Sequence, residues 1–340
     1  MISPHAHAAG SVTRSIGPFL VPPLGLGCMN LSHAYGTPLD PATAANLLLS
    51  ALEAGVTLFD TAALYGFGAN ETLLGKVLSP YRHQIVLASK CGMTGVDGRR
   101  VIDGRPAVLT QTCDQALKRL NTDTIDLYYL HRWDRKVPIE ESVGALSRLV
   151  EAGKIRAIGL SEVSSATIRR AHAIHPIAAV QTEYSVWTRN AEISVLATCQ
   201  EIGAAFVAFS PLGRGYLANG LSSVAHLAAL PDNDIRHAMP RFAPDNFLAN
   251  ESFRRAWVSM SLEKRCTPAQ LALAWLLHRC PHIIPIPGTT SVHHLQENLG
   301  ALSLQLSETD MQAIAQLCAS YPIHGNRYNE STQSEIDTES

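Results

Sequence analysis

The chain has 340 residues, of which 46% are hydrophobic and 16% charged, a composition typical of one large globular domain or of two smaller ones. Its net charge is −2, with no basic stripe and no long acidic tail, which gives no support to nucleic-acid or anionic-membrane partners. The longest strongly apolar run, near Ala269 to Leu277, is shorter than the roughly 20 residues of a membrane-spanning helix, so we expect a soluble protein.

The amino terminus and the cysteines indicate the compartment. Met1 to Gly10 has no apolar stretch after a basic start, so it does not resemble a signal peptide. The 7 cysteines are odd in number, dispersed and without a CxxC pair, which favours reduced thiols and a cytoplasmic location. Among the 14 histidines, His172 and His175 have helical spacing but no acidic partner nearby, so we predict no metal site.

Short apolar runs alternate with longer stretches of helical spacing along the whole chain. Helical candidates include Thr43–Ala54, Val108–Leu120, Ile139–Glu151, Glu192–Glu201 and Pro268–His278. Continuous apolar runs are typical of strands buried on both faces, and their alternation with helices indicates a parallel sheet. Eight runs are predicted as strands: Leu24–Cys28, Thr57–Asp60, Gln84–Ser89, Ile125–Leu130, Ile155–Gly159, Ala178–Gln181, Ala205–Phe209 and Ile283–Ile286.

Eight strand–helix units in about 300 residues predict an α/β fold of the (β/α)8 TIM-barrel type. We expect a single barrel domain over residues 12–328, a flexible arm over 1–11 and a flexible polar tail over 329–340. The segment from Gly213 to about Asn250, after the seventh strand, is too long for an ordinary connection. We interpret it as a loop on the substrate side of the barrel.

Polar residues follow several predicted strands, at the end where barrel enzymes place their active sites. Asp60, Lys90 and His131 follow the second, third and fourth strands, and Tyr65 lies in the loop after Asp60. Each alone is more often a cap, a packing residue or a solvated side chain, but together they form a coherent proton donor. A lysine ammonium beside a phenol lowers its pKa, a carboxylate orients the lysine, and a neutral imidazole orients a carbonyl oxygen.

A proton donor of this kind needs a hydride donor, and this implies a nicotinamide cofactor because no side chain supplies hydride. The segment Gly25-Leu26-Gly27 lacks the third glycine of the dinucleotide-binding fingerprint, so the cofactor is expected across the barrel mouth.

The sequence resembles the aldo-keto reductases, in order, from about residue 12 to 328. The resemblance is closest to the microbial and plant aldehyde, pyridoxal or perakine reductases. It rests on the segments LGLGCM (24–29), FDTAxxYG (59–66), ASK (88–90), DLYYLHR (126–132), GKIRAIGLS (153–161), VQTEYS (180–185), FSPLGRG (209–215) and IPGTT (286–290).

The resemblance implies a catalytic tetrad of Asp60, Tyr65, Lys90 and His131, with Tyr65 as the proton donor to an aldehyde or ketone. It implies that Ser161 and Gln181 hold the nicotinamide carboxamide and that Phe209 stacks on its ring, where many relatives have Tyr. The further cofactor-binding residues that it implies are Gly27, Cys28, Met29, Asp60, Ser210, Leu212, Arg214, Gly215, Gly288, Thr289, His294, Glu297 and Asn298.

One departure from the family concerns the 2′-phosphate. Many relatives have Lys or Arg where this sequence has Thr290, Ser291, His293 and His294, and histidines carry only partial charge near neutral pH. We expect NADPH, with NADH less favoured. The sequence leaves open the substrate, the oligomeric state and the part that Trp133 and Trp187 play as pocket walls.

Two other functions remain open at this point: a cofactor-sensing protein, like the channel β subunits of this fold, and, more weakly, a metal hydrolase.

Overall fold

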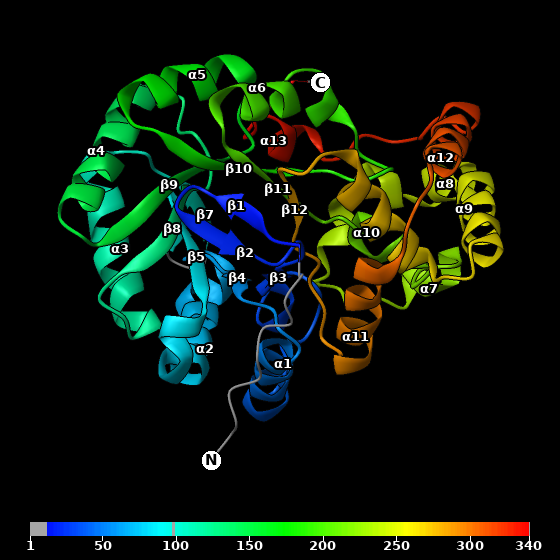
Figure 1. The fold of residues 1–340 in the computed structure, drawn as a ribbon, viewed down its shortest axis with the longest axis horizontal. Helices are drawn as coiled ribbons and strands as arrows, with labels where there is room; N and C mark the ends of the chain where they lie inside the picture. Colours follow the sequence, from blue (N-terminus) through cyan, green and yellow to red (C-terminus); the bar gives the residue numbers. More distant parts are fainter. Residues whose placement is uncertain (1–11, 97–98, 340) are drawn as a thin grey trace.

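The structure is a computed structural model and describes residues 12–96 and 99–339 (Figure 1). The arm predicted over residues 1–11 lies outside the described residues.

All eight predicted strands form one parallel sheet whose spatial order follows the chain. Its ends meet, because the backbone N–H of Gly25 donates to Pro285 O (3.0 Å) and that of Gly27 donates to Pro287 O (3.3 Å). These bonds close the sheet into the expected (β/α)8 barrel. The strands are β3 (Leu26–Gly27), β4 (Leu58–Asp60), β5 (Val86–Cys91), β8 (Ile125–Leu130), β9 (Ile155–Ser161), β10 (Ile177–Glu183), β11 (Ala205–Phe209) and β12 (Ile283–Pro285).

Alternation along the strands divides the core into two parts, since successive side chains point to opposite faces. One set fills the inside of the barrel, with Leu58, Val86, Leu127 and Val207 among its members. The other set lies between the strands and the surrounding helices. This pattern explains why each strand is apolar on both faces.

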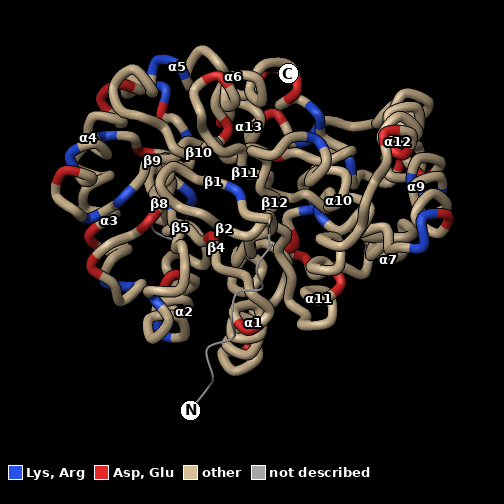
Figure 2. The backbone as a smooth tube through the Cα atoms, in the orientation of Figure 1, with Lys and Arg blue, Asp and Glu red and all other residues tan. Residues whose placement is uncertain are grey.

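Many of the Lys, Arg, Asp and Glu residues lie in the helices around the barrel (Figure 2). Their first turns follow sequence signals: Asp40 accepts hydrogen bonds from the N–H groups of Ala42 and Thr43, and Pro41 begins the helix. The helices are α1 (Pro41–Glu53), α2 (Ala69–Leu78), α3 (Pro106–Leu120), α4 (Ile139–Glu151), α5 (Ser165–Ile174), α6 (Val195–Ile202), α10 (Pro268–Arg279) and α11 (Val292–Gly300). Of the predicted helices, Glu192–Glu201 differs most, because a short turn over Asn190–Glu192 precedes α6.

A hairpin of β1 (Arg14–Ile16) and β2 (Phe19–Val21) lies across the amino-terminal end of the barrel (Figure 1). Ile16, Phe19 and Val21 join the apolar set inside the barrel, so the hairpin plugs this end. The opposite end, at the carboxyl ends of the strands, remains for the functional site.

The long segment after β11 contains α7 (Val224–Ala228) and α8 (Pro244–Ala249), with short 3-10 turns between them. With α9 (Glu251–Glu263) and α12 (Glu308–Ser320) it forms a group of helices beside the barrel (Figure 1). A second hairpin, β6 (Met93–Val96) and β7 (Arg99–Ile102), follows β5. The segment after β11 thus has more helical structure than the loop expected from the sequence.

The described part of the polar tail, residues 329–339, contacts the barrel, and the flexibility expected over residues 329–340 stays a prediction. The tail forms a short helix, α13 (Glu330–Gln333), and then runs past the start of α5. The carboxylate of Asp337 accepts hydrogen bonds from the N–H (2.9 Å) and hydroxyl (2.8 Å) of Ser164 and from the hydroxyl of Thr167 (2.7 Å). An acidic residue that appears merely solvated in the sequence therefore satisfies polar groups at a helix start.

No helix in the described ranges is long and apolar enough to cross a membrane.

Candidate active site

Strand alternation places the predicted catalytic residues on the inside of the barrel mouth. Asp60 lies two residues beyond Leu58, and Lys90 lies two beyond Ala88, which also faces inward. His131 follows Tyr129 in the same way, directly after β8. All three side chains are buried. Side chains two residues apart on a strand point to the same face. Each of these polar residues therefore follows an inward-facing apolar residue and lies at the rim of the barrel interior.

Tyr65 joins them from the turn after β4. The ammonium of Lys90 forms an ion pair with Asp60 and donates to the Thr61 carbonyl (2.8 Å) and to the Tyr65 hydroxyl (3.3 Å). The rings of Tyr65 and His131 meet edge to face, with centroids 5.9 Å apart. The four residues that the sequence predicts as a tetrad therefore lie together.

The electrostatics of the pair Lys90 and Tyr65 differ in one respect from the expectation. Burial is the largest single influence and lowers the pKa of Lys90, but the charges of Asp60 and Tyr65 and the hydrogen bonds to them together outweigh burial and raise the pKa, so the ammonium is retained. Burial raises the pKa of Tyr65, and Lys90 only partly opposes this effect. The prediction of a lowered phenol pKa is thus wrong for the protein without cofactor, because desolvation of the phenolate exceeds its attraction to the lysine.

His131 is a neutral imidazole. Burial, followed by the charges of Arg132 and Lys90, holds its pKa well below the ordinary value of 6.5. Its Nδ1 is buried without a hydrogen-bond partner among the described residues. A neutral ring can donate one N–H to a carbonyl oxygen without adding charge to the site.

A cavity of about 640 Å³ opens above the tetrad. Asp60, Tyr65 and His131 line one end of it, and His294 and Asn298 line the other. Every residue that the sequence predicts to bind cofactor lines this cavity except Cys28: Gly27, Met29, Asp60, Ser161, Gln181, Phe209, Ser210, Leu212, Arg214, Gly215, Gly288, Thr289, His294, Glu297 and Asn298.

Cys28 was predicted to bind cofactor, but its side chain is fully buried in the outer core. Alternation accounts for this: Leu26 and Cys28 face the helices, and Gly27 between them faces the cavity. Burial raises the pKa of the Cys28 thiol, as expected for an inert core cysteine.

The chemistry beside the tetrad fits a carboxamide group. Ser161 Oγ accepts from Arg132 (3.2 Å), which leaves its proton free to donate. Gln181 Nε2 donates to Asp60 Oδ2 (2.7 Å), which leaves its amide oxygen free to accept. One free donor and one free acceptor match the oxygen and nitrogen of a carboxamide. The half-buried ring of Phe209 lines the same part of the cavity.

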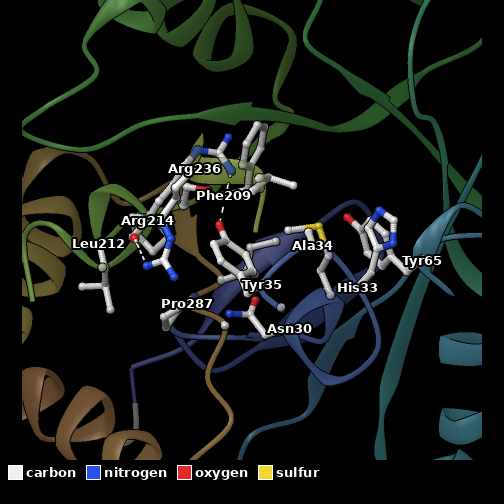
Figure 3. A pocket seen from close by; sticks show the side chains of 18 of the residues that line it. Asn30, His33, Ala34, Tyr35, Tyr65, Phe209, Leu212, Arg214, Arg236 and Pro287 are labelled. Carbon is white, nitrogen blue, oxygen red and sulfur yellow. Dashed lines mark hydrogen bonds between the residues drawn. The ribbon is translucent and has the colours of Figure 1, made fainter. Parts of the chain in front are cut away.

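Arg214 lies farther along the cavity, in a strained turn. Its φ is +57° and that of Ser210 is +47°, a region that non-glycine residues seldom adopt. The guanidinium donates to Glu183 (2.8 Å), to the hydroxyl of Tyr328 (3.1 Å) and to that of Tyr35 (3.3 Å). Figure 3 shows Tyr35 and Arg214 side by side above the cavity.

The far end of the cavity meets the first turn of α11. Ser291 caps this helix, and its hydroxyl accepts from the N–H of His294. Thr289, His294 and Asn298 line the cavity here. Helix starts favour phosphate groups, so the residues present fit the phosphorylated adenosine end of a dinucleotide.

Two tryptophans considered as pocket walls do not line the cavity. Trp187 is buried and stacks on Tyr216 with ring centroids 4.2 Å apart, and Trp133 donates to the Val137 carbonyl (2.9 Å). Sequence reasoning missed other lining residues, which come from the loops after β3 and β8, the β6–β7 hairpin, the long segment after β11 and the tail: Asn30, His33, Tyr35, Met93, Arg100, Arg132, Arg236, Met239, Asn329 and Thr332. Of these, only Arg132, directly after His131, could have been found from its position beside a strand end.

Comparison with known proteins agrees with this geometry. The model of the aldo/keto reductase family matches residues 23–319. A probable aldo-keto reductase 1 from Glycine max is 44% identical over 313 residues, which cover 91% of this chain and 89% of that protein. The chain belongs to the aldo/keto reductase family.

Solved structures of the family share its fold. The glycerol dehydrogenase AKR11B4 from Gluconobacter oxydans has a TM-score of 0.84 and 25% identity, covering 93% of this chain and 98% of its own. An aldo/keto reductase from Klebsiella pneumoniae, solved with NADP and acetate, has a TM-score of 0.68 and 27% identity, covering 94% and 99%. This aldo-keto reductase is therefore an oxidoreductase that uses a nicotinamide cofactor, NAD(H) or NADP(H), and acts on small carbonyl compounds.

Proposed function

We propose that this enzyme reduces an aldehyde or ketone to the alcohol with NADPH, and that Tyr65 is the proton donor. The proposal rests above all on the contact between the Lys90 ammonium and the Tyr65 hydroxyl at the floor of the cavity. Reduced nicotinamide, when bound, supplies a hydride to the carbonyl carbon. The carbonyl oxygen takes the proton of Tyr65 as that carbon gains the hydride.

Each member of the tetrad has a distinct part in this step. The raised pKa of Tyr65 keeps the phenol protonated and ready to donate at neutral pH. Lys90 stabilises the phenolate that remains, and Asp60 holds Lys90 charged. The neutral ring of His131 orients the carbonyl oxygen by a hydrogen bond. Water then restores the proton of Tyr65.

The cofactor positions are part of the same proposal. Ser161 and Gln181 hold the carboxamide, and Phe209 covers one face of the ring. Arg214 and the start of α11 bind the phosphates. The preference for NADPH over NADH rests on His294, which lines the far end of the cavity.

We also place the enzyme in the cytoplasm. All seven cysteines lie in the described residues, and each is a free thiol, as a reducing compartment favours.

The test is to follow oxidation of NADPH, and separately of NADH, by the purified protein with pyridoxal, an aromatic aldehyde, methylglyoxal and an aliphatic ketone. Faster turnover with NADPH on any of them supports the proposal. Tight cofactor binding without turnover on any of them contradicts it and favours a cofactor-sensing protein. Faster turnover with NADH contradicts the assigned cofactor preference alone.

A further inference from the structure

Two arginines, Arg100 and Arg132, line the tetrad end of the cavity, and the Lys90 ammonium lies directly beneath. His33 and His131 also line it, but burial lowers the pKa of both imidazoles, so they add no charge at neutral pH. Asp60 supplies the one carboxylate among the described residues that line this end of the cavity. Both of its oxygens are already used, one by Lys90 and the other by Gln181. The part of the cavity that receives the carbonyl compound therefore has an excess of positive charge.

Arg132 is a buried guanidinium without an acidic partner in the described chain. Its side chain is 8% exposed, and one nitrogen, Nη1, donates to the His131 carbonyl (2.7 Å) and to Ser161 Oγ (3.2 Å). Its Nε is buried without a hydrogen-bond partner in residues 12–96 and 99–339. Burial of a charge without a counter-ion is costly, so such a group points to a ligand that supplies one.

The nearest acidic candidate is occupied by other groups. Glu162 directly follows the neighbouring strand, β9, but its carboxylate accepts from both terminal nitrogens of Arg327, at 3.0 and 2.6 Å, and from the hydroxyl of Thr338 (2.7 Å). The charge of Arg132 helps to lower the pKa of Glu162, but among the described residues the direct ion pair of Glu162 is with Arg327, which leaves the nitrogens of Arg132 for the cavity.

Arg100 adds a second positive group from the β6–β7 hairpin. It pairs with Glu335 of the tail (2.5 Å) through Nη2 alone, and both side chains are partly exposed, at 41% and 21%. After burial, the charge of Arg100 is the next cause that lowers the pKa of His33, and it also lowers that of His131. Its guanidinium therefore acts on the space beside His131.

We propose that the physiological substrate is a carbonyl compound with an anionic group, a carboxylate or a phosphate, which Arg132 and Arg100 bind. The inference rests on the proposed reductase function and names its substrate class. The Nε of Arg132, and the Arg100 nitrogens other than Nη2, have no hydrogen-bond partner in residues 12–96 and 99–339, and they supply charge-assisted hydrogen bonds to such an anion. An anion here also provides the counter-ion that Arg132 lacks.

The cofactor phosphates lie elsewhere in the proposed arrangement. Figure 3 shows His33 and Tyr65 at one side of the cavity and Leu212, Arg214 and Pro287 at the other. Arg132 contacts Ser161 and His131, so it belongs to the reacting side. The two arginines are therefore assigned to the substrate and not to the dinucleotide.

The first test compares aldehydes of one shape and different charge. We would measure kcat/KM with para-carboxybenzaldehyde, with its neutral carbamoyl analogue and with its cationic trimethylammonio analogue, at saturating NADPH. Hydrogen bonds to charged groups contribute enough to expect about a 10- to 100-fold preference for the carboxylate. For a phosphate group, we would compare kcat/KM for glyceraldehyde phosphate with kcat/KM for glyceraldehyde. The larger of the two ratios of anionic to neutral kcat/KM, carboxylate or phosphate, identifies the preferred anion. Equal rates with the carboxylate and carbamoyl compounds, and equal rates within the phosphate pair, would overturn the inference.

Variants assign the effect to the arginines. Arg100→Gln reduces the ratio of anionic to neutral kcat/KM several-fold. The matched control is Arg99→Gln, which removes the same charge from the same strand at a position that does not line the cavity, and it retains the ratio. Arg132→Gln is expected to reduce this ratio further. If this buried variant fails to fold, the comparison of Arg100→Gln with Arg99→Gln still tests the inference. A ratio unchanged in Arg100→Gln contradicts the role of Arg100.

Binding without turnover separates this inference from the proposed function. Calorimetry would compare para-hydroxymethylbenzoate with its amide, as product analogues, on the protein with NADP+. Tighter binding of the benzoate supports the anion site even if no aldehyde is reduced. Equal affinity, with normal reduction of the neutral aldehyde, leaves the reductase function and removes the anion site.

Discussion

The carboxylate of Glu183 and the guanidinium of Arg214 form an ion pair at the barrel mouth, 2.8 Å apart, with side chains only 4% and 6% exposed. Glu183 ends β10, and Arg214 belongs to the strained turn after β11. The pair therefore joins two neighbouring strand ends beside the proposed cofactor position. A buried pair of this kind adds little net stability, but loss of one partner leaves an uncompensated charge.

Glu183→Gln is expected to lower the free energy of unfolding by about 3–5 kcal/mol, because Arg214 keeps its charge and loses its carboxylate. Urea denaturation followed by circular dichroism would measure the change. The control is Glu201→Gln, whose exposed pair with Arg169 is worth about 0–1 kcal/mol. Equal losses in the two variants would contradict the importance of burial.

Tyr65→Phe is expected to reduce kcat by about 10²–10⁴-fold, because the variant loses only the proton donor. The Kd for NADPH, measured by fluorescence quenching, remains near that of the wild type. Tyr321→Phe, outside the cavity, controls for the loss of a hydroxyl. Retained turnover in Tyr65→Phe would mean that another acid, with His131 the first candidate, donates the proton.

Stability is expected to fall as the pH decreases below about 6.5. The pKa of His131 is held well below this value in the folded protein, chiefly by burial, so in this range the unfolded chain binds more protons. The free energy of unfolding therefore decreases with decreasing pH, by up to about 1.4 kcal/mol per pH unit for this group. His131→Asn reduces the slope between about pH 5 and 6.5, and the exposed His226→Gln retains it. If the free energy of unfolding of His131→Asn falls with decreasing pH as steeply as that of the wild type, protonation of His131 is not the cause of the pH dependence.

The Kd for NADPH is expected to increase more than that for NADH when the pH is raised from about 6 to about 8, because imidazoles lose their charge over this range. His294→Gln removes the difference between the two cofactors. Parallel pH curves for NADPH and NADH in the wild-type enzyme would show that the histidines do not contact the 2′-phosphate.

Asp337→Ala is expected to lower the free energy of unfolding by about 1–2 kcal/mol, because the start of α5 loses the carboxylate that Ser164 and Thr167 contact. Thermal unfolding would measure the effect. Ser334→Ala removes only a hydrogen bond within the exposed part of the tail and serves as the control. A melting temperature unchanged in Asp337→Ala would indicate that the tail is detached in solution.

The barrel and the tetrad were predictable from the sequence because both depend on local patterns. Apolar runs mark the strands, and alternation brings Asp60, Lys90 and His131 to the rim after inward-facing apolar residues. The same rule places the side chain of Cys28 in the outer set with Leu26, away from the cavity. Alternation along the segment from Leu26 to Cys28 was therefore enough to predict this placement.

Other features depend on contacts between distant segments, which no local pattern shows. The raised pKa of Tyr65 depends on how completely its ring is buried. The attachment of the tail depends on the hydrogen bond between Ser164 and Asp337. The charge of the cavity depends on the ion pair that Glu162 forms with Arg327 and not with Arg132. Each of these requires knowledge of which groups compete for one partner in three dimensions.

The buried carboxylate of Glu162 has a consequence for synthesis of the chain on the ribosome. Its partners Arg327 and Thr338 follow it by 165 and 176 residues, so the carboxylate lacks these partners until that much more of the chain has been synthesised. The strands can assemble earlier, but this corner of the barrel mouth forms only once residues 327–338 are available to it. A nascent chain that stops short of Arg327 would therefore present a folded barrel with an open, incomplete rim.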